Sequence, residues 1–143
     1  MTIDQISVFV ENNLGRLAEV TGILGDANVD LRAMSIADTT DFGILRLIVD
    51  DPARAIEILR SAGCVVSVTQ VLAVSLKDVP GSLAKVLAIL ADENISVEYA
   101  YAFITRKKDD AYVIFRVEDN ERAAEVFARH GVKTAGAGEL FDL

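Results

Sequence analysis

Apolar and polar residues alternate with a period of two along several short segments, which is typical of strands that bury one face. The predicted strands are residues 5–10, 29–37, 44–49, 65–69, 72–76, 95–104 and 111–117. Apolar residues recur instead at helical spacing over 17–27, 52–62, 80–93 and 120–129, which predicts helices there. The order β-α-β-β-α-β therefore occurs twice. Residues 132–143, which glycines interrupt, are expected to form a weaker last strand and a tail.

The ends of the predicted helices carry specific residues. Asp51-Pro52 predicts a helix start, because an aspartate cap accepts hydrogen bonds from N–H groups and proline fits the first helical position. Asp119 is expected to cap the last helix in the same way. Residues that tolerate the left-handed conformation are expected to end the helices, namely Asn28, Gly63, Asn94 and Gly131.

The chain contains an internal repeat. When residues 14–31 are aligned with residues 80–97, eight of the eighteen pairs are identical, whereas unrelated sequences would share about one. The identical pairs are Gly15/Gly81, Leu17/Leu83, Ala18/Ala84, Val20/Val86, Ile23/Ile89, Leu24/Leu90, Asp26/Asp92 and Asn28/Asn94. The repeat indicates an internal duplication.

The repeat divides the 143 residues into two small domains, residues 1–69 and residues 70–143. Two successive β-α-β-β-α-β units predict an α+β protein with two ferredoxin-like folds. Each fold is expected to be a four-stranded antiparallel sheet with both helices on one face. Neither proline nor glycine interrupts Val65 to Leu76, so no linker is expected between the copies.

The alternation also predicts which residues face the helices. The helix-facing set is Val8, Val10, Leu31, Leu45, Leu47, Val74, Leu76, Val97, Val113 and Phe115. The opposite face is expected to carry Met34, Ile36, Ile44, Arg46, Ile48, Tyr112, Ile114 and Arg116. This second face is too apolar for water alone, so we expect the other copy or a second chain to cover it.

Charge argues against nucleic acid as a partner. The net charge is −8, whereas a nucleic-acid binder needs a basic surface that neutralises phosphates. The only basic run, Arg106-Lys107-Lys108, is followed at once by Asp109-Asp110 and is interpreted as a solvated hairpin tip. We expect a cytoplasmic protein without membrane contact, because the sequence shows neither an apolar run of membrane-spanning length nor a leader.

The duplicated segment resembles the ACT domain. The resemblance rests on a polar residue three positions before a glycine, an apolar helix that ends in asparagine, and then Val29-Asp30-Leu31 or Ile95-Ser96-Val97. It covers nearly the whole chain, twice. The second copy, Asp78-Val79-Pro80-Gly81-Ser82-Leu83, is the closer match, whereas the first copy has Leu14 in place of the proline. ACT domains are regulatory modules that bind amino acids in enzymes of amino-acid metabolism.

The resemblance implies ligand sites near the loop after the first strand of each copy and the start of the second strand. Carried over by position, the first set is Asn12, Asn13, Leu14, Gly15, Arg16 and Asp30, and the second is Asp78, Val79, Pro80, Gly81, Ser82 and Ser96. N–H groups that open the helices favour a ligand carboxylate, and glycine permits close backbone approach. In the alternative interpretation the glycines only allow a tight turn and Asn12 and Asp78 only cap the helices.

The sequence leaves three classes of function open. The first is a non-enzymatic regulatory protein that binds a free amino acid and modulates a biosynthetic partner enzyme, most simply as a homodimer. The second is a docking subunit like the small subunit of acetolactate synthase, with weak or no ligand binding of its own. An enzyme is the least favoured, because His130 is the only histidine, Cys64 the only cysteine, and neither belongs to a catalytic set. No cofactor or metal is expected.

Overall fold

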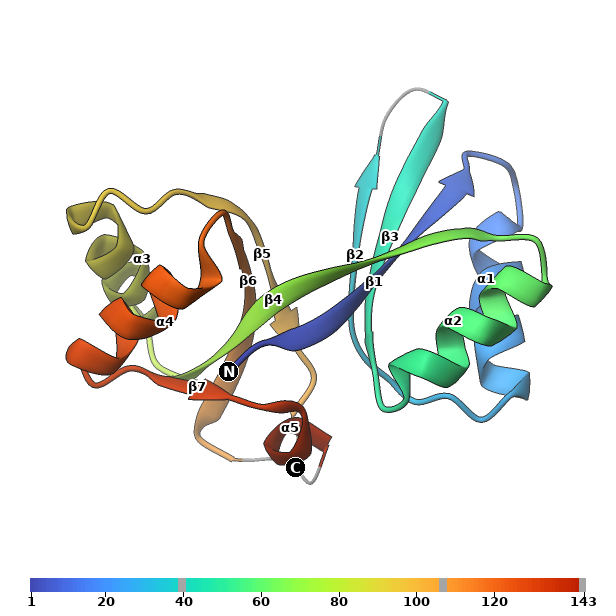
Figure 1. Ribbon diagram of the computed structural model, residues 1–143. Helices are drawn as coiled ribbons and strands as arrows, with labels where there is room; N and C mark the ends of the chain where they lie inside the picture. The colour runs from blue at the N-terminus through green and yellow to red at the C-terminus, as the bar shows by residue number, and fades with distance from the viewer. Residues whose placement is uncertain (39–40, 106–107, 142–143) are drawn as a thin grey trace. The chain divides into compact units, whose positions relative to one another are not determined.

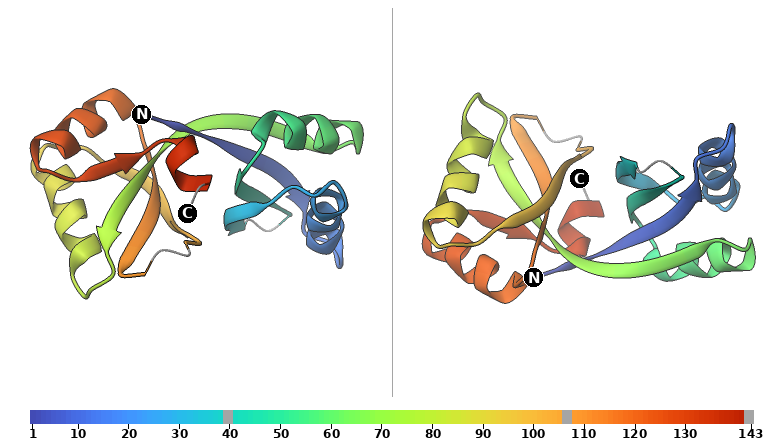
Figure 2. Two further views of the ribbon diagram at one scale, coloured as in Figure 1. Left: turned by 90° about the horizontal axis from the view of Figure 1, so that it is seen from below. Right: turned by 90° about the horizontal axis from the view of Figure 1, so that it is seen from above.

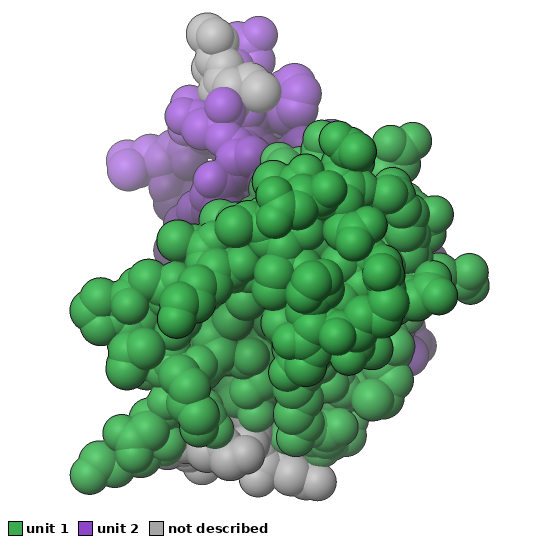
Figure 3. Space-filling model, turned by 90° about the vertical axis from the view of Figure 1, so that its left-hand side faces the viewer, with its two compact units in different colours: residues 1–3, 70–143 green, residues 4–69 purple. Residues whose placement is uncertain are grey.

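The computed structural model describes residues 1–38, 41–105 and 108–141, which divide into two compact units. One unit is residues 4–69, and the other combines residues 1–3 with residues 70–143 (Figure 3). Strand β4 (Val65–Lys77) contributes its first part to the former unit and its second part to the latter. Each unit is described by itself below.

Unit 4–69 is a four-stranded sheet with two helices on one face (Figure 1). Its elements are β1 (Ile3–Glu11), α1 (Arg16–Asp26), β2 (Leu31–Asp38), β3 (Phe42–Val49), α2 (Pro52–Ser61) and the first part of β4. The strand order is β2-β3-β1-β4, and β3 pairs antiparallel with both β1 and β2. This is the ferredoxin-like arrangement that the sequence predicts.

The second unit repeats the same order and adds one helix (Figure 2). After the second part of β4 come α3 (Ser82–Asp92), β5 (Val97–Phe103), β6 (Asp110–Val117), α4 (Asn120–Arg129), β7 (Lys133–Ala135) and α5 (Ala137–Phe141). The sheet order is β7-β4-β6-β5, with every pair antiparallel. The predicted fold class is confirmed for both copies.

Two separate hydrophobic cores lie between the sheets and their helices. In unit 4–69 the core is built around Val8, Leu45 and Leu47 of the sheet with Leu24 and Leu59 of the helices. In the second unit the corresponding residues include Val74, Phe115, Leu90 and Phe127, with the rings of Phe115 and Phe127 6.3 Å apart. All ten residues predicted to face the helices belong to these cores or pack against them.

A β-bulge changes which residues of β2 face the helices. The register shifts between Leu31 and Ala33, so Met34 lies opposite Leu47 and Ile36 opposite Leu45. Both partners belong to the helix-packed core, so the prediction that Met34 and Ile36 lie on the opposite face is wrong. An extra residue in a strand reverses the alternation beyond it, and the two-residue period alone cannot reveal this. The same shift occurs in β5 between Val97 and Tyr99.

The helix ends agree with the sequence signals. Asp51 caps α2 by accepting a hydrogen bond from the Arg54 N–H at 3.2 Å, and Asp119 caps α4 by accepting one from the Arg122 N–H at 3.0 Å. The four predicted left-handed residues all have positive φ: Asn28 and Asn94 at 57°, Gly63 at 85° and Gly131 at 70°.

The C-terminal segment differs from the expected strand and tail. Pairing with β4 ends after the three residues of β7, and the chain then forms the short helix α5. Leu140 of α5 is fully buried, and the ring of Phe141 lies 6.4 Å from that of Phe103 on the sheet. Part of the apolar face opposite α3 and α4 is therefore covered by the same unit's own C-terminal helix. Of the predicted basic hairpin tip, Arg106 and Lys107 lie outside the described residues, and Lys108 is an exposed turn residue.

Candidate functional site

The loop between β1 and α1 is a tight turn fixed by main-chain hydrogen bonds. The Asn13 N–H donates to the Glu11 carbonyl at 2.8 Å, and the Arg16 N–H donates to the Asn13 carbonyl at 3.2 Å. Asn12 is held from outside the loop, because its N–H donates to the Asp41 carbonyl at 3.3 Å. Gly15 is the N-terminal cap residue of α1 and has φ 81°. A left-handed conformation at this point is inexpensive only for glycine.

The loop between β4 and α3 repeats this geometry bond for bond. The Val79 N–H donates to the Lys77 carbonyl at 2.8 Å, the Ser82 N–H to the Val79 carbonyl at 3.3 Å, and the Asp78 N–H to the Asp109 carbonyl at 3.0 Å. Gly81 has φ 89°. The duplication detected in the sequence therefore preserves the turn conformation as well as the residues.

The structure decides against one part of the alternative interpretation. The residues that cap α1 and α3 are Gly15 and Gly81, and neither helix has a side-chain cap hydrogen bond. Asn12 and Asp78 therefore do not cap these helices. The Arg16 and Ser82 N–H groups donate to carbonyls of their own loops, so the donors left at the positive end of each helix dipole are the N–H groups of the next helical residues.

The remaining residues predicted in the first loop point in different directions. The Leu14 side chain is fully exposed at the loop surface. The Arg16 guanidinium pairs with the Glu19 carboxylate at 3.1 Å and contacts the Cys64 sulfur at 3.8 Å. The hydrogen bond that Arg16 donates to the Glu19 carboxylate raises the pKa of Arg16 above its ordinary value. The Arg16 guanidinium thus already has partners in α1 and at Cys64.

Asp30 and Ser96 are not brought to the loops of their own copies. Asp30 precedes β2 at the end of the sheet where Leu31 lies opposite Val49, whereas the Gly15 loop lies at the other end of the strands, where Glu11 lies opposite Phe42. The Asp30 N–H donates to the Asp50 carboxylate at 3.0 Å, and its own carboxylate lies 3.7 Å from Arg32. Ser96 precedes β5 in the equivalent position.

A small cavity of about 230 Å³ adjoins the Gly15 loop. Its polar lining comes from Glu11, Asn12, Asn13 and Asp38, so it is rich in oxygen acceptors. The Asn13 side-chain amide donates to the Glu11 carboxylate at 2.9 Å. Such a lining suits a cation or an ammonium group, but the volume lies below the range of about 300–1,000 Å³ of ordinary ligand sites.

A larger cavity of about 650 Å³ adjoins the Gly81 loop, and we name it the Gly81 cavity. Val79 and Ser82 line it from the loop. Its other walls come from the end of β4, the first turns of α3, the start of β6, the end of α4 and the start of β7. They comprise Ser75, Leu76, Lys77, Lys85, Val86, Ile89, Asp110, Tyr112, His130, Gly131, Val132 and Lys133. Asp78 and Pro80 are exposed beside it and do not line it.

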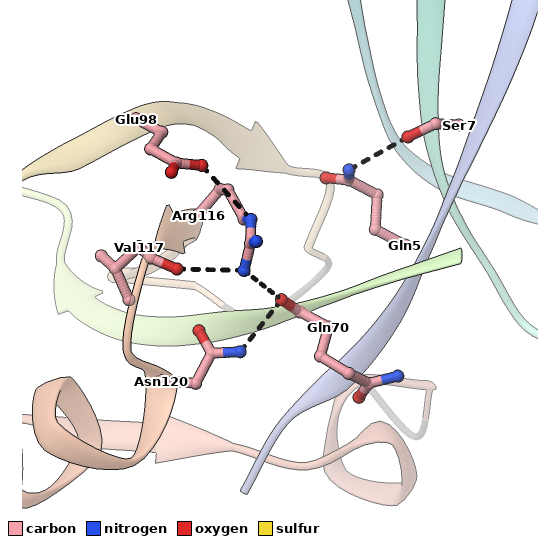
Figure 4. A network of polar contacts seen from close by, with 7 residues as sticks. All are labelled: Gln5, Ser7, Gln70, Glu98, Arg116, Val117 and Asn120. Atoms are coloured by element: carbon pink, nitrogen blue, oxygen red, sulfur yellow. Dashed lines mark hydrogen bonds and ion pairs between the residues drawn. The ribbon is translucent and has the colours of Figure 1, made fainter. Parts of the chain in front are cut away.

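A third cavity, of about 630 Å³, contains Ser96. Acidic residues dominate its lining, with Glu98, Glu118 and Glu121 among them. Figure 4 shows the polar contacts beside it: the Arg116 guanidinium lies 3.3 Å from the Glu98 carboxylate and donates to the Gln70 carbonyl, which also accepts from Asn120. In unit 4–69 the figure shows Gln5 donating to the Ser7 hydroxyl at 3.4 Å.

Sequence reasoning missed the basic residues of the Gly81 cavity. Lys77, Lys85 and Lys133 come from three elements and belong to no motif. The one available signal is the helical spacing of Ser82, Lys85 and Ile89, which puts them on one face of α3. Lys77 pairs with Asp110 at 3.0 Å, and this hydrogen bond raises the pKa of Lys77.

Histidine and cysteine each occur once in the chain. His130 is the C-terminal cap residue of α4 and directly precedes Gly131, the predicted helix end. Among residues 1–38, 41–105 and 108–141, no set of three or more histidine, cysteine, aspartate or glutamate side chains is placed to hold a metal ion. No helix in the described part of the chain has both the length and the apolar character needed to cross a bilayer.

Comparisons with known proteins agree with the duplicated fold. The chain resembles protein BT0572 from Bacteroides thetaiotaomicron over 100% of its own length and 98% of that chain, with 40% identity and a TM-score of 0.92. The ligand-free regulatory subunit of aspartate kinase from Thermus thermophilus matches 88% of this chain and 90% of its own, with 18% identity and a TM-score of 0.61. At that identity the likeness shows the fold alone. No curated protein matches the chain.

The family comparison covers both copies at once. The model of a family described as the ACT domain pair matches residues 1–142. This match includes both glycine turns and both β-α-β-β-α-β units. The resemblance that the duplicated motif indicated is therefore confirmed. The chain belongs to the ACT domain pair family.

Proposed function

We propose that this protein is a non-enzymatic regulator that binds a free amino acid at the Gly81 loop and modulates a partner enzyme of amino-acid metabolism. The observation that carries the proposal is the position of the Gly81 turn, whose residues Val79 and Ser82 line a cavity of about 650 Å³. That volume lies within the range of small-molecule sites. The smaller Gly15 cavity makes the first copy the weaker candidate.

The groups around the Gly81 turn suit both charged ends of an amino acid. The N–H groups that open α3 favour a carboxylate, because they lack partners within the helix and the dipole is positive there. The Ser82 hydroxyl adds a neutral donor and acceptor in the same lining. Asp110 lines the cavity and Asp78 stands exposed beside it, so either carboxylate can accept hydrogen bonds from the ligand ammonium.

Regulation requires that the ligand distinguish between two states of the protein or its complexes, because a ligand with equal affinity for both shifts nothing. Regulatory subunits of aspartate kinase share the fold of this chain. The proposed role is of the same kind: ligand occupancy at the loop changes affinity for a partner. A homodimer is the simplest assembly, and light scattering on the purified protein tests it.

Thermal unfolding in the presence of each free amino acid at millimolar concentration tests the proposal. A ligand that binds only the folded state adds about 2.7 kcal/mol at a hundredfold excess over Kd. We expect a clear rise in Tm for one amino acid or a few related ones. If all of them leave Tm unchanged, amino-acid binding is rejected.

Substitution at the turn locates the site. Gly81→Val should abolish the ligand-induced shift, because a branched side chain in a left-handed residue distorts the turn. Gly63→Val is the matched control, since Gly63 also has positive φ and nothing within 4 Å of an added Cβ but belongs to unit 4–69 and not to the Gly81 loop. Normal binding by the Gly81 variant would remove the turn from the mechanism. Asp78→Ala should weaken binding more than Asn12→Ala if the second copy is the working site, and the reverse order would reassign the site to the first copy.

A second candidate function is docking to an enzyme without strong ligand binding. Exposed aromatic rings on the sheet of unit 4–69 favour it: Phe9 is 44% exposed and Phe42 42%, with ring centroids 6.1 Å apart. Exposed apolar surface of this kind is typical of protein contacts. Docking predicts that Phe9→Ser abolishes capture of the partner enzyme while any amino-acid response stays intact. Amino-acid sensing predicts instead that Gly81→Val abolishes the response and that Phe9→Ser leaves it intact.

A further inference from the structure

The Gly81 cavity lies at an open sheet edge. β7 pairs with β4 only as far as Ser75, which lies opposite Lys133. Beyond that point Leu76 and Lys77 continue β4 without a β7 partner, and the first turns of α3 stand beside them. The cavity therefore collects side chains from β4, α3 and β7, which are far apart in the sequence.

The charge of this lining is opposite to the charge of the whole chain. The lining contains three lysines, Lys77, Lys85 and Lys133, and one carboxylate, Asp110, in a protein whose net charge is −8. Lys77 pairs with Asp110 at 3.0 Å, and Lys133 pairs with Glu139 at 3.3 Å. In the part of the chain that the structure describes, Lys85 has no carboxylate within ion-pair distance. Lys85 therefore makes this lining favourable for an anion.

The rest of the lining sets the size and character of that anion. Leu76, Val86, Ile89 and Val132 supply apolar walls, which suit a short carbon chain. The Ser82 N–H already donates to the Val79 carbonyl, so a ligand carboxylate would bind the N–H groups that follow it in α3. Lys85, together with Lys133 in exchange for its exposed pair with Glu139, is then left for a second negative group. Asp110 remains for an ammonium. Two negative groups and one positive group on a short carbon chain describe an amino acid with an acidic side chain.

We propose that the Gly81 cavity selects amino acids with a carboxylate side chain, aspartate or glutamate, through Lys85 and Lys133. The inference rests on the proposed amino-acid binding and names the class of ligand. Hydrogen bonds between ions of opposite charge are stronger than neutral ones, so the acid should be preferred over its amide of the same shape. The exposure of these lysines keeps the effect of each one moderate.

Calorimetric titration of the full chain with two matched ligand pairs, aspartate against asparagine and glutamate against glutamine, tests the preference, with leucine and lysine as outside references. Each pair differs by one charge at nearly constant shape. We expect one acid to bind about tenfold more tightly than its amide, in keeping with charge-assisted hydrogen bonds. Lys85→Gln and Lys133→Gln should each weaken binding of the acid about fivefold and leave amide binding unchanged.

Arg60→Gln is the control, because it also removes one positive charge from an exposed helical residue, in unit 4–69. Arg60→Gln should change neither the affinity for the acid nor the affinity for its amide. Equal binding of acid and amide, tighter binding of leucine or lysine, or acid binding that survives both lysine substitutions overturns this inference and leaves amino-acid binding in place. Failure of every amino acid to bind overturns the proposed function, and this inference with it.

Discussion

Two alanine substitutions in the same helix should change stability in opposite directions. Gly15 opens α1 with φ 81° and ψ −4°, and Gly22 lies inside α1 on its exposed side. An added Cβ would meet no heavy atom within 4 Å at either position, so packing contributes nothing to either change. The difference between them is therefore a difference of backbone conformation alone.

The magnitudes follow from that conformation. A non-glycine residue in the left-handed region costs about 1–2 kcal/mol, so Gly15→Ala should lower the free energy of unfolding by about 1 kcal/mol after the smaller unfolded-state entropy of alanine is counted. Alanine stabilises a helix interior by about 1 kcal/mol relative to glycine, so Gly22→Ala should raise the free energy of unfolding by that amount. The two variants should differ by about 2 kcal/mol.

Urea unfolding followed by circular dichroism measures both changes in one transition, because both glycines belong to unit 4–69. Equal m-values across wild type and variants would show that only stability changed. If Gly15→Ala proved as stable as the wild type, Gly15 would not be left-handed in solution. If Gly22→Ala proved destabilising, the exposed interior position in α1 would be misassigned.

Three more predictions concern a helix cap, a core contact and a helix end, and urea unfolding measures the change in stability for each. Asp119→Ala removes the cap on α4 and should cost about 1 kcal/mol, whereas Asp119→Asn should keep most of the stability; an equal loss in both would exclude the cap as the cause. Phe127→Ala empties a fully buried position against Phe115 and should cost about 3–5 kcal/mol, and a loss below 1 kcal/mol would contradict the packing of α4 on the sheet. Asn94→Ala should destabilise by about 1 kcal/mol while Asn94→Gly is neutral or better, since φ is 57°, and equal stability of the two variants would refute the left-handed helix end.

The features that the sequence predicted are those that depend on residues close together in the chain. Asp51 before Pro52 marks a helix start, and Asn28 and Asn94 mark helix ends, because each residue type has its own backbone preference. The element order followed from the period of the apolar residues. Duplication strengthened every one of these predictions, since the same signal appeared in two places.

The features that the sequence did not predict depend on tertiary structure. The bulge in β2 adds one residue at Arg32, and no residue type announces it, so Met34 was placed on the wrong face. Gly136 and Gly138 argued against a helix at the end of the chain, but the buried Leu140 anchors α5 there. The three lysines of the Gly81 cavity come from β4, α3 and β7, and only folding brings them together.

The bulges in β2 and β5 also show how far the two copies resemble each other. They follow Leu31 and Val97, the same position in both copies, so the likeness of the copies includes an irregularity that the apolar pattern does not reveal. The helix α5 has no counterpart in the first copy, where the residues after Val65 continue β4 instead of turning at Gly136. The two copies thus differ at their C-terminal ends, whereas they agree in the turns and bulges that shape each sheet.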